Sequence, residues 1–331
     1  MPSLRASPGY WIVTALALAT LCGPLAVGLA ALSGNGHRWV DFLAQLVAPA
    51  LVATAILFVV LLVMRVWPAA LAAGLVMALL FAAAQPQWNP PHAKARAGAP
   101  SVTLYSANTH RYNTDAGAIA ASIRAARADI VILVEVSPEV ARQFSALLPE
   151  YPYVVGARTQ RQRQMQTVIA SRWPLGRMHY IRYVAAGGVV ADTPLGKINL
   201  VAVHLTRPWP SEFQWGQISQ VMAVSDYVAI QSHLPTLIAG DFNSVSSGRI
   251  GRQVQSQMGV IPAPGWPGTW PGGLPTGLGL TIDQVYRTPD LALIERRIGV
   301  HNGSDHWPVV TRLTLADPGA DQRTDLGADP G

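Results

Sequence analysis

The segment LIAGDFNSV, residues 237–245, places a carboxylate and a carboxamide at the end of an apolar run. The run Leu237–Ala239 is typical of a buried strand, and Asp241 and Asn243 follow it on either side of Phe242. Alternate residues of an extended chain face the same way. We therefore expect the two polar side chains to point at one place beyond the end of the strand.

Other apolar runs also carry polar side chains near an end. They are Asn108 in SVTLYSAN, Glu135 in DIVILVEV, His204 in LVAVHL, Asp283 in TIDQVY, and Asp305 with His306 before the run WPVVTRLTL. Acidic side chains on buried strands are costly unless they are paired or hold a metal. Each residue alone has an ordinary structural explanation, such as a paired acid, a hydrogen-bonded core histidine, an Asx-turn or a cap. One shared site accounts for all of them, so the pattern predicts a single site.

Strand and helix patterns alternate over residues 101–316, a length typical of one large domain. Strands are predicted at 101–108, 129–136, 167–171, 197–206, 235–243, 281–286, 291–300 and 307–315, and helices at 115–128, 137–148 and 211–232. Ser137 followed by Pro138 is a strong helix-start signal. Long crossovers followed by strand pairs predict two mixed sheets with helices outside them.

Three apolar runs, residues 10–32, 43–64 and 66–84, precede this domain. The whole chain is 50% hydrophobic and 13% charged, which is too apolar for an ordinary soluble domain. Each run could cross a hydrocarbon core of about 30 Å as a helix, and a cleaved signal peptide would explain only one of them. We predict a membrane domain with three transmembrane helices over 1–84, a linker over 85–100 and a disordered tail over 317–331.

The polar residues in their order resemble the endonuclease/exonuclease/phosphatase superfamily. The resemblance rests on Asn108, Glu135, His204, Asp241, Asn243, Asp283, Asp305 and His306, in the motifs SAN, ILVEV, VAVHL, AGDFN, TIDQV and GSDHWPV. GDFN and SDH are specific when they occur together in this order. The resemblance covers residues 101–315. It implies an α/β fold, a four-layered α/β sandwich of two mixed β-sheets flanked by helices, with the site at one edge of both sheets.

The resemblance also implies a metal-dependent attack on phosphorus. Glu135 would be the main ligand of a divalent cation, helped by Asn108 and Asp305. Mg²⁺ prefers hard oxygen ligands and keeps several waters, so few protein ligands suffice. We expect Mg²⁺ as the cofactor, with Mn²⁺ as the alternative, to neutralise phosphate charge and stabilise the transition state.

The remaining matched residues would act on the reacting groups. Asp241 would orient or deprotonate the attacking water, and Asn243 would contact a phosphate oxygen or the nucleophile. His204 and His306 would hydrogen-bond the developing charge on phosphorus. Asp283 would orient the His306 ring, as a carboxylate fixes the tautomer of an imidazole.

Two segments offer weaker candidates for substrate binding. Arg161 and Arg163, in RQRQMQT, could bind phosphate or belong to a basic loop without that role. Trp270 lies in residues 265–280, GWPGTWPGGLPTGLGL, which could be an apolar pocket rim, a membrane-facing loop or an ordered Pro/Gly loop. Residues 101–316 hold 17 Arg and 1 Lys against 13 acids. This balance suits a phosphate substrate but is too weak to indicate duplex DNA.

Three functions follow in order of preference. The first is a membrane-anchored phosphoesterase acting on a phosphorylated substrate, polyprenyl-linked or otherwise lipid-linked. The layout resembles that of bacterial membrane members of the superfamily associated with glycopeptide resistance, whose proposed substrate is the polyprenyl carrier. A membrane-tethered nuclease is the alternative, so nucleic acid is a possible but not favoured partner. A non-catalytic binding module is the second alternative. The bilayer is an expected partner, and no protein partner is predicted.

The same features predict a bacterial-type inner (cell) membrane protein that crosses the bilayer several times. Arg5 and the terminal amine precede the first apolar run, which favours an inside N-terminus. Three spans would then place the catalytic domain outside the cytoplasm.

Overall fold

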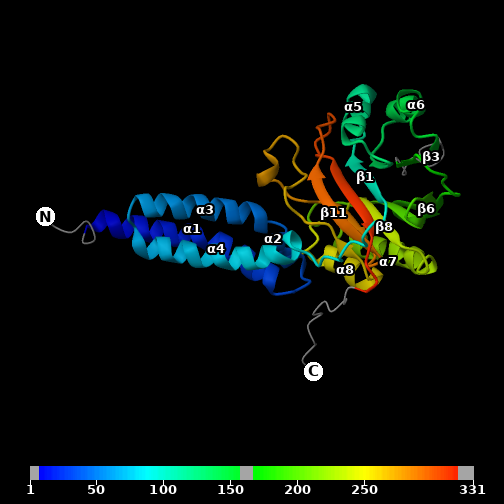
Figure 1. Cartoon of the computed structure of the whole chain (residues 1–331). Helices are drawn as coiled ribbons and strands as arrows, with labels where there is room; N and C mark the ends of the chain where they lie inside the picture. The colour runs from blue at the N-terminus through cyan, green and yellow to red at the C-terminus, as the bar shows by residue number, and fades with distance from the viewer. Residues whose placement is uncertain (1–6, 157–166, 320–331) are drawn as a thin grey trace.

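The computed structural model describes residues 7–156 and 167–319. Figure 1 shows a bundle of N-terminal helices beside an α/β domain. Arg161 and Arg163 lie outside the described residues, as does the predicted tail beyond residue 319.

The first sheet of the α/β domain has the strand order β11–β12–β1–β2–β4–β3. Its strands are β1 (Ser101–Asn108), β2 (Ile130–Val134), β3 (Tyr153–Gly156), β4 (Val168–Ser171), β11 (Leu291–Ile298) and β12 (Val309–Leu315). β1 and β2 run parallel, and the other neighbouring strands run antiparallel.

The second sheet has the strand order β5–β6–β7–β8–β10–β9. Its strands are β5 (His179–Ile181), β6 (Ala185–Thr193), β7 (Gly196–His204), β8 (Thr236–Asp241), β9 (Ile261–Pro262) and β10 (Asp283–Arg287). β7 and β8 run parallel, and the other neighbours run antiparallel. Both sheets are therefore mixed, and each has one parallel pair near its centre.

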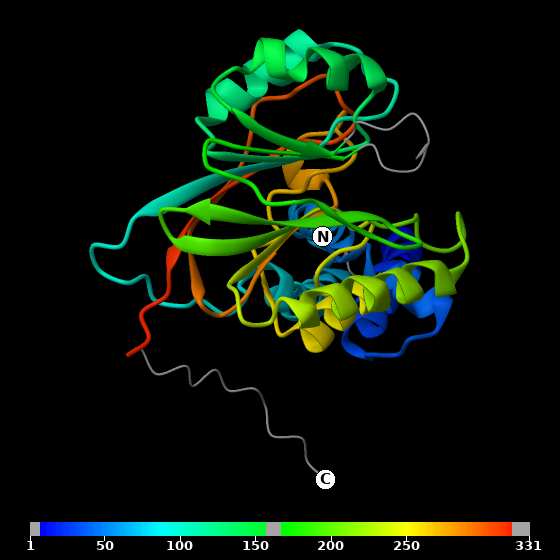
Figure 2. The same ribbon diagram turned by 90° about the vertical axis from the view of Figure 1, so that its right-hand side faces the viewer.

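Four layers are visible in Figure 2, with helices outside each of the two stacked sheets. The helices over the first sheet are α5 (Ala116–Ala126) and α6 (Pro138–Leu147), and those over the second are α7 (Gln214–Ile230) and α8 (Arg249–Met258). Between the sheets lies a core of aliphatic side chains that includes Leu104, Ile132, Leu200 and Leu237. The predicted four-layered sandwich of two mixed sheets is confirmed.

The apolar helices α1 (Pro8–Leu32), α3 (Val47–Val63) and α4 (Trp67–Trp88) pack against one another. α1 and α4 are each long and apolar enough to cross a membrane. The predicted second span is interrupted, because α2 (Arg38–Ala44) and α3 meet at an angle of 57°. The described residues therefore contain two candidate spans, or three if this bent pair crosses as one.

Gly240 of the GDFN motif shows how tightly the two parallel strands of the second sheet approach each other. Its φ is +140°, and a Cβ atom there would lie 2.0 Å from the backbone oxygen of Val203. Only glycine fits such a position without a clash. The next register pair along these strands is His204 with Asp241, so the tight approach brings these two residues side by side.

Candidate active site

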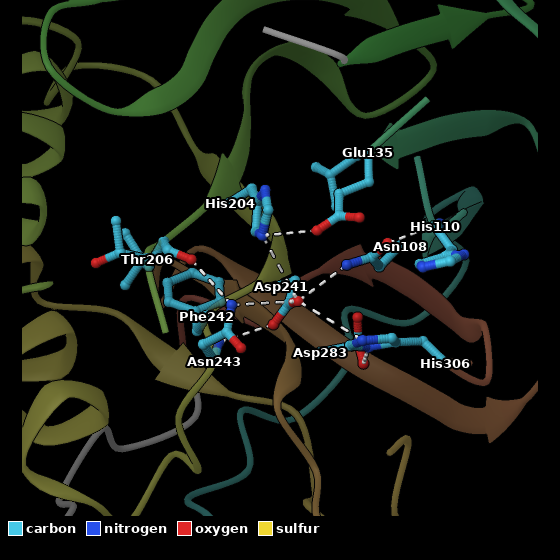
Figure 3. Close-up of polar contacts among 12 residues, drawn as sticks. Asn108, His110, Glu135, His204, Thr206, Asp241, Phe242, Asn243, Asp283 and His306 are labelled. Carbon is cyan, nitrogen blue, oxygen red and sulfur yellow. Dashed lines mark hydrogen bonds and ion pairs between the residues drawn. The ribbon is translucent and has the colours of Figure 1, made fainter. Parts of the chain in front are cut away.

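The strand topology gathers the predicted site residues at one edge of the sandwich. Asn108 ends β1 and Glu135 directly follows β2, so the carboxyl ends of this parallel pair meet. His204 and Asp241 end the parallel pair of the second sheet. Asp283 begins β10 and is the antiparallel register partner of Asp241. Residues from both sheets therefore converge on one cluster (Figure 3).

The carboxylate of Asp241 lies at the centre of this cluster, and its side chain is only 2% exposed. Its Oδ1 accepts a hydrogen bond from the backbone N–H of Asn243 at 2.7 Å. Its Oδ2 accepts from Nδ2 of Asn108 at 3.0 Å and from Nδ2 of Asn243 at 3.4 Å. The Nδ2 of Asn243 also donates to the backbone oxygen of Leu205 at 2.9 Å. Both amide side chains therefore orient the carboxylate.

Two histidines face the same carboxylate oxygen. The Nε2 atoms of His204 and His306 each lie 3.9 Å from Oδ2 of Asp241. Nε2 of His204 also lies 3.3 Å from Oε1 of Glu135. On the far side of its ring, Nδ1 of His306 is 2.9 Å from Oδ2 of Asp283. The order carboxylate, imidazole, carboxylate is the arrangement that fixes a histidine ring and its tautomer.

Burial and neighbouring charges both shift the pKa values of Asp241 and His306. Burial, followed by the charge of Asp283, raises the pKa of Asp241, although His306 and His204 act in the opposite direction. Burial lowers the pKa of His306, but the charge and hydrogen bond of Asp283 and the charges of Asp241 and Asp305 outweigh it and raise that pKa to about 10. A protonated His306 between two buried carboxylates therefore offsets part of their charge.

Glu135 stands at the exposed side of the cluster, with its side chain 20% exposed. Its Oε2 accepts from the backbone N–H of Arg111 at 3.2 Å. Glu135 has φ +51° and Asn243 has φ +48°, left-handed conformations that a non-glycine residue adopts at a cost of about 1–3 kcal/mol. Such conformations concentrate at functional sites, so their occurrence at two predicted site residues supports a common role.

Two groups of residues in the cluster could hold a divalent cation. Asp241, Asp283 and His306 have ligand atoms within 4.8 Å of one another, but all three are buried and Asp283 already bonds to His306. The carboxylate of Glu135 is partly open to solvent, which suits an ion that retains water ligands. The carboxylate of Glu135 therefore fits the cation better than the buried trio does.

Three other predicted residues, Asn108, Asp305 and Trp270, differ in how they relate to the cluster around Asp241. Oδ1 of Asn108 accepts from the backbone N–H of His110 at 2.9 Å, while its amide nitrogen bonds to Asp241. Asp305 is exposed, next to the buried His306. Trp270 is 38% exposed on the loop of residues 265–280.

Three supporting residues have no sequence motif of their own. Nε2 of Gln217, on α7, donates to the backbone oxygens of Thr206 and Phe242 at 2.9 and 3.2 Å, which ties the two loops after β7 and β8 together. Gln220 accepts from the backbone N–H of Thr206. Oγ1 of Thr269 accepts from the backbone N–H groups of Ile282 and Asp283, both at 3.2 Å. A polar residue within an apolar helix pattern is the one sequence signal that could have indicated Gln217.

The family model of the endonuclease/exonuclease/phosphatase family matches residues 105–306. The chain therefore belongs to this family. A comparison with curated proteins found no match.

Solved structures share the fold of the α/β domain. An endonuclease/exonuclease/phosphatase from Bacteroides vulgatus superposes with a TM-score of 0.55 at 15% identity, covering 65% of this chain and 99% of its own. One from Beutenbergia cavernae gives a TM-score of 0.52 at 19% identity, covering 65% and 72%. Humanized D. rerio TDP2 gives 0.50 at 13% identity, covering 65% and 99%. The family and this shared fold define the chain as a hydrolase of phosphoester bonds.

We expect the substitution Asp283→Asn to lower the pKa of His306 from about 10 towards its ordinary value of 6.5. The substitution removes the largest influence that raises this pKa. Between these two values the folded protein holds a proton that the unfolded chain releases. The resulting stabilisation is complete below about pH 6.5 and is lost as the pH rises through about 10.

NMR titration of the His306 ring in metal-free protein measures this shift. The variant Asp290→Asn is the control, because that residue lies in the turn before β11. An unchanged His306 titration in Asp283→Asn would show that the two side chains are not coupled.

Proposed function

We propose that the protein is a membrane-anchored, divalent-metal-dependent phosphoesterase that hydrolyses a phosphate ester or pyrophosphate on a lipid-linked substrate. The observation that carries the catalytic part is the buried carboxylate of Asp241, faced by two imidazoles and oriented by two carboxamides. The membrane part is supported by the apolar helices α1, α3 and α4.

Glu135 is the residue we assign to the cation, and we assign Asn108 and Asp305 as further oxygen ligands. The ion is Mg²⁺ in this proposal, and Mn²⁺ has the same preference for hard donors. Enzymes of this family are generally dependent on divalent metals, and the carboxylates here match that chemistry. When bound, the cation would neutralise phosphate charge and stabilise charge that develops in the transition state.

The side chains of the chain would share the remaining chemistry. Asp241 accepts a proton from the attacking water, a role that its raised pKa favours. Protonated His306 donates a hydrogen bond to an oxygen on phosphorus, and His204 does so from the opposite side. Asp283 keeps the His306 ring in place. Asn243 hydrogen-bonds to the carboxylate of Asp241. In this proposal it also hydrogen-bonds to the water that Asp241 activates.

The lipid-linked substrate is supported by the loop of residues 265–280, which reaches both the bundle and the active site. The 3₁₀ helix η2 (Thr276–Leu278) within it lies against α3, and the gold-orange segment leans towards the bundle in Figure 1. Thr269 of the same loop accepts from the backbone N–H of Asp283. Exposed apolar side chains line this loop, among them Trp266, Trp270, Leu274 and Leu278. A bilayer around α3 would therefore meet this loop next to the active site.

The orientation we propose has the N-terminus inside a bacterial-type cell membrane and the α/β domain outside it. The turn between α3 and α4 holds Arg65, which is exposed at the end of the bundle away from the α/β domain. A charged residue there favours the inner side. An inactive alkaline phosphatase fused to the C-terminus would contradict this orientation.

A nuclease is the alternative function, and a non-catalytic binding module is the second. Two parallel assays of the full-length protein, both with Mg²⁺, distinguish the three functions. One uses plasmid DNA as the substrate, and the other uses polyprenyl pyrophosphate in vesicles. Rapid DNA cleavage without action on the lipid would favour the nuclease. Inactivity on every phosphoester would favour the binding module.

We expect Glu135→Gln to lower Mg²⁺-dependent phosphate release by at least about 100-fold, because a bound cation contributes several kcal/mol to the transition state. The matched control is Glu139→Gln, which changes a partly exposed acid on α6 that pairs with Arg142 and should leave the rate unchanged. Calorimetric Mg²⁺ binding should weaken in the first variant only. Full activity of Glu135→Gln, or of the wild type in excess chelator, would falsify metal dependence at this residue.

We also expect the double variant Leu274→Ser, Leu278→Ser to lower kcat/KM on polyprenyl pyrophosphate in vesicles by about 10-fold. Loss of about 1.4 kcal/mol of apolar contact with lipid corresponds to this factor. The rate on a soluble phosphodiester should not change. Ile294→Ser is the control, because Ile294 is similarly exposed, at 42% against 44% and 40% for the two leucines. Equal losses on both substrates would argue against a lipid contact.

A further inference from the structure

Helix α2 leaves the apolar bundle and lies where the bundle meets the α/β domain (Figure 1). Two polar side chains at this junction are buried, Asp41 at 9% and Gln45 at 7% exposure. Buried polar groups are costly unless they are hydrogen-bonded. The hydrogen-bond partners of Asp41 and Gln45 therefore show which part of the α/β domain is contacted at the 57° bend between α2 and α3.

Both side chains bond to the loop that follows the GDFN motif. Oδ1 of Asp41 accepts from the backbone N–H of Arg249 at 3.0 Å. Oε1 of Gln45 accepts from the backbone N–H of Val245 at 2.8 Å, and its Nε2 donates to Oγ of Ser244 at 3.1 Å. This loop therefore finds acceptors in and directly after α2, about 200 residues earlier in the chain.

Asp41 also serves as a cap for helix α8. The first residue of α8 is Arg249, and the preceding N-cap residue, Gly248, has no side chain that could accept from the first turn. The N–H groups of a first helical turn need acceptors, and a negative charge is favourable there. The carboxylate of Asp41 supplies both the acceptor and the negative charge. The first turn of α8 is therefore capped by a side chain of α2.

The other end of α2 contacts the loop after His204. The ring of Trp39 lies edge-on against that of Trp209, with centroids 4.2 Å apart. The guanidinium of Arg38 lies 5.1 Å from the same Trp209 ring. Just before α2, the backbone oxygen of Gly36 accepts from Nε2 of Gln214 at 2.8 Å. One short helix therefore contacts the loops that follow both β7 and β8.

We propose that α2 positions the active site, and that Asp41 and Gln45 impose the conformation of Asn243 through the loop that they hold. Asn243 is left-handed, at φ +48°, and a non-glycine residue keeps that conformation only where its surroundings impose it. Ser244, directly after it, bonds to Gln45. Neither Asp41 nor Gln45, the residue that follows α2, bonds to Asp241 among the described contacts, so both are positioning residues. The inference rests on the proposed function, because its effect is read on phosphoester hydrolysis.

The test uses Asp41→Ala and Gln45→Ala in the full-length protein, with bis(p-nitrophenyl) phosphate as a soluble substrate and Mg²⁺ present. We expect kcat to fall about 10-fold in each variant with KM unchanged, because a misplacement of about 1 Å can lower a rate by up to about 100-fold. Asp41→Asn keeps an oxygen acceptor and should recover most of the rate. Asn89→Ala is the control, since the Asn89 side chain at the same end of the bundle bonds to Gln85.

Unchanged kcat in both alanine variants would overturn the proposal, as would an equal loss in Asn89→Ala. Where an alanine variant does not fold, Gln45→Met, which removes both the acceptor and the donor at a similar side-chain volume, is judged by the same criteria. Where the wild type hydrolyses no phosphoester, the proposed function fails and hydrogen exchange decides the role of α2. Faster exchange of the Asn243 amide in Asp41→Ala then supports positioning, and unchanged exchange overturns it.

Discussion

The structure depends on how the buried carboxylate of Asp241 is hydrogen-bonded and oriented. A carboxylate that is 2% exposed is stable as an anion only where hydrogen bonds and positive charge replace the lost water. Two carboxamides, a backbone N–H and two imidazoles supply this environment. These groups belong to Asn108, Asn243, His204 and His306, which lie at the ends of strands of both sheets or in the turns beside them, so the site forms only when both sheets and their stacking are complete.

The sandwich provides this convergence through two parallel strand pairs, one in each sheet. Parallel neighbours place their carboxyl ends at the same edge, and antiparallel β10 returns Asp283 to the same point. Loops after these strands cannot orient the site alone, since they lack regular hydrogen bonding. Gln217 ties two of them together from α7, and Thr269 supports the start of β10. Contacts from the apolar segment through α2 complete this framework.

Much of this organisation could be predicted from local pattern, but several elements could not. Apolar strands that end in Asn108, His204 and Asp241 have both the periodicity and the terminal polar residue that mark them. Strand β6 was not predicted, because two adjacent glycines interrupt its apolar pattern, and polar α8 has little hydrophobic signal. Gln45, at the bend between α2 and α3, bonds to partners about 200 residues away, which no local window contains. The site residues, by contrast, are predicted from their order along the chain.

Whether Asp241 and His306 act on one transition state is measured most directly by a double-mutant cycle in kcat. Asp241→Asn and His306→Asn should each lower kcat by about 100-fold or more when all variants are assayed at a temperature at which they remain folded. Because groups that act as a unit are strongly non-additive, we expect the double variant to lose much less than the product of the two single losses. If the double variant instead loses the full product of the two single losses, Asp241 and His306 do not act in the same step, which would contradict the account.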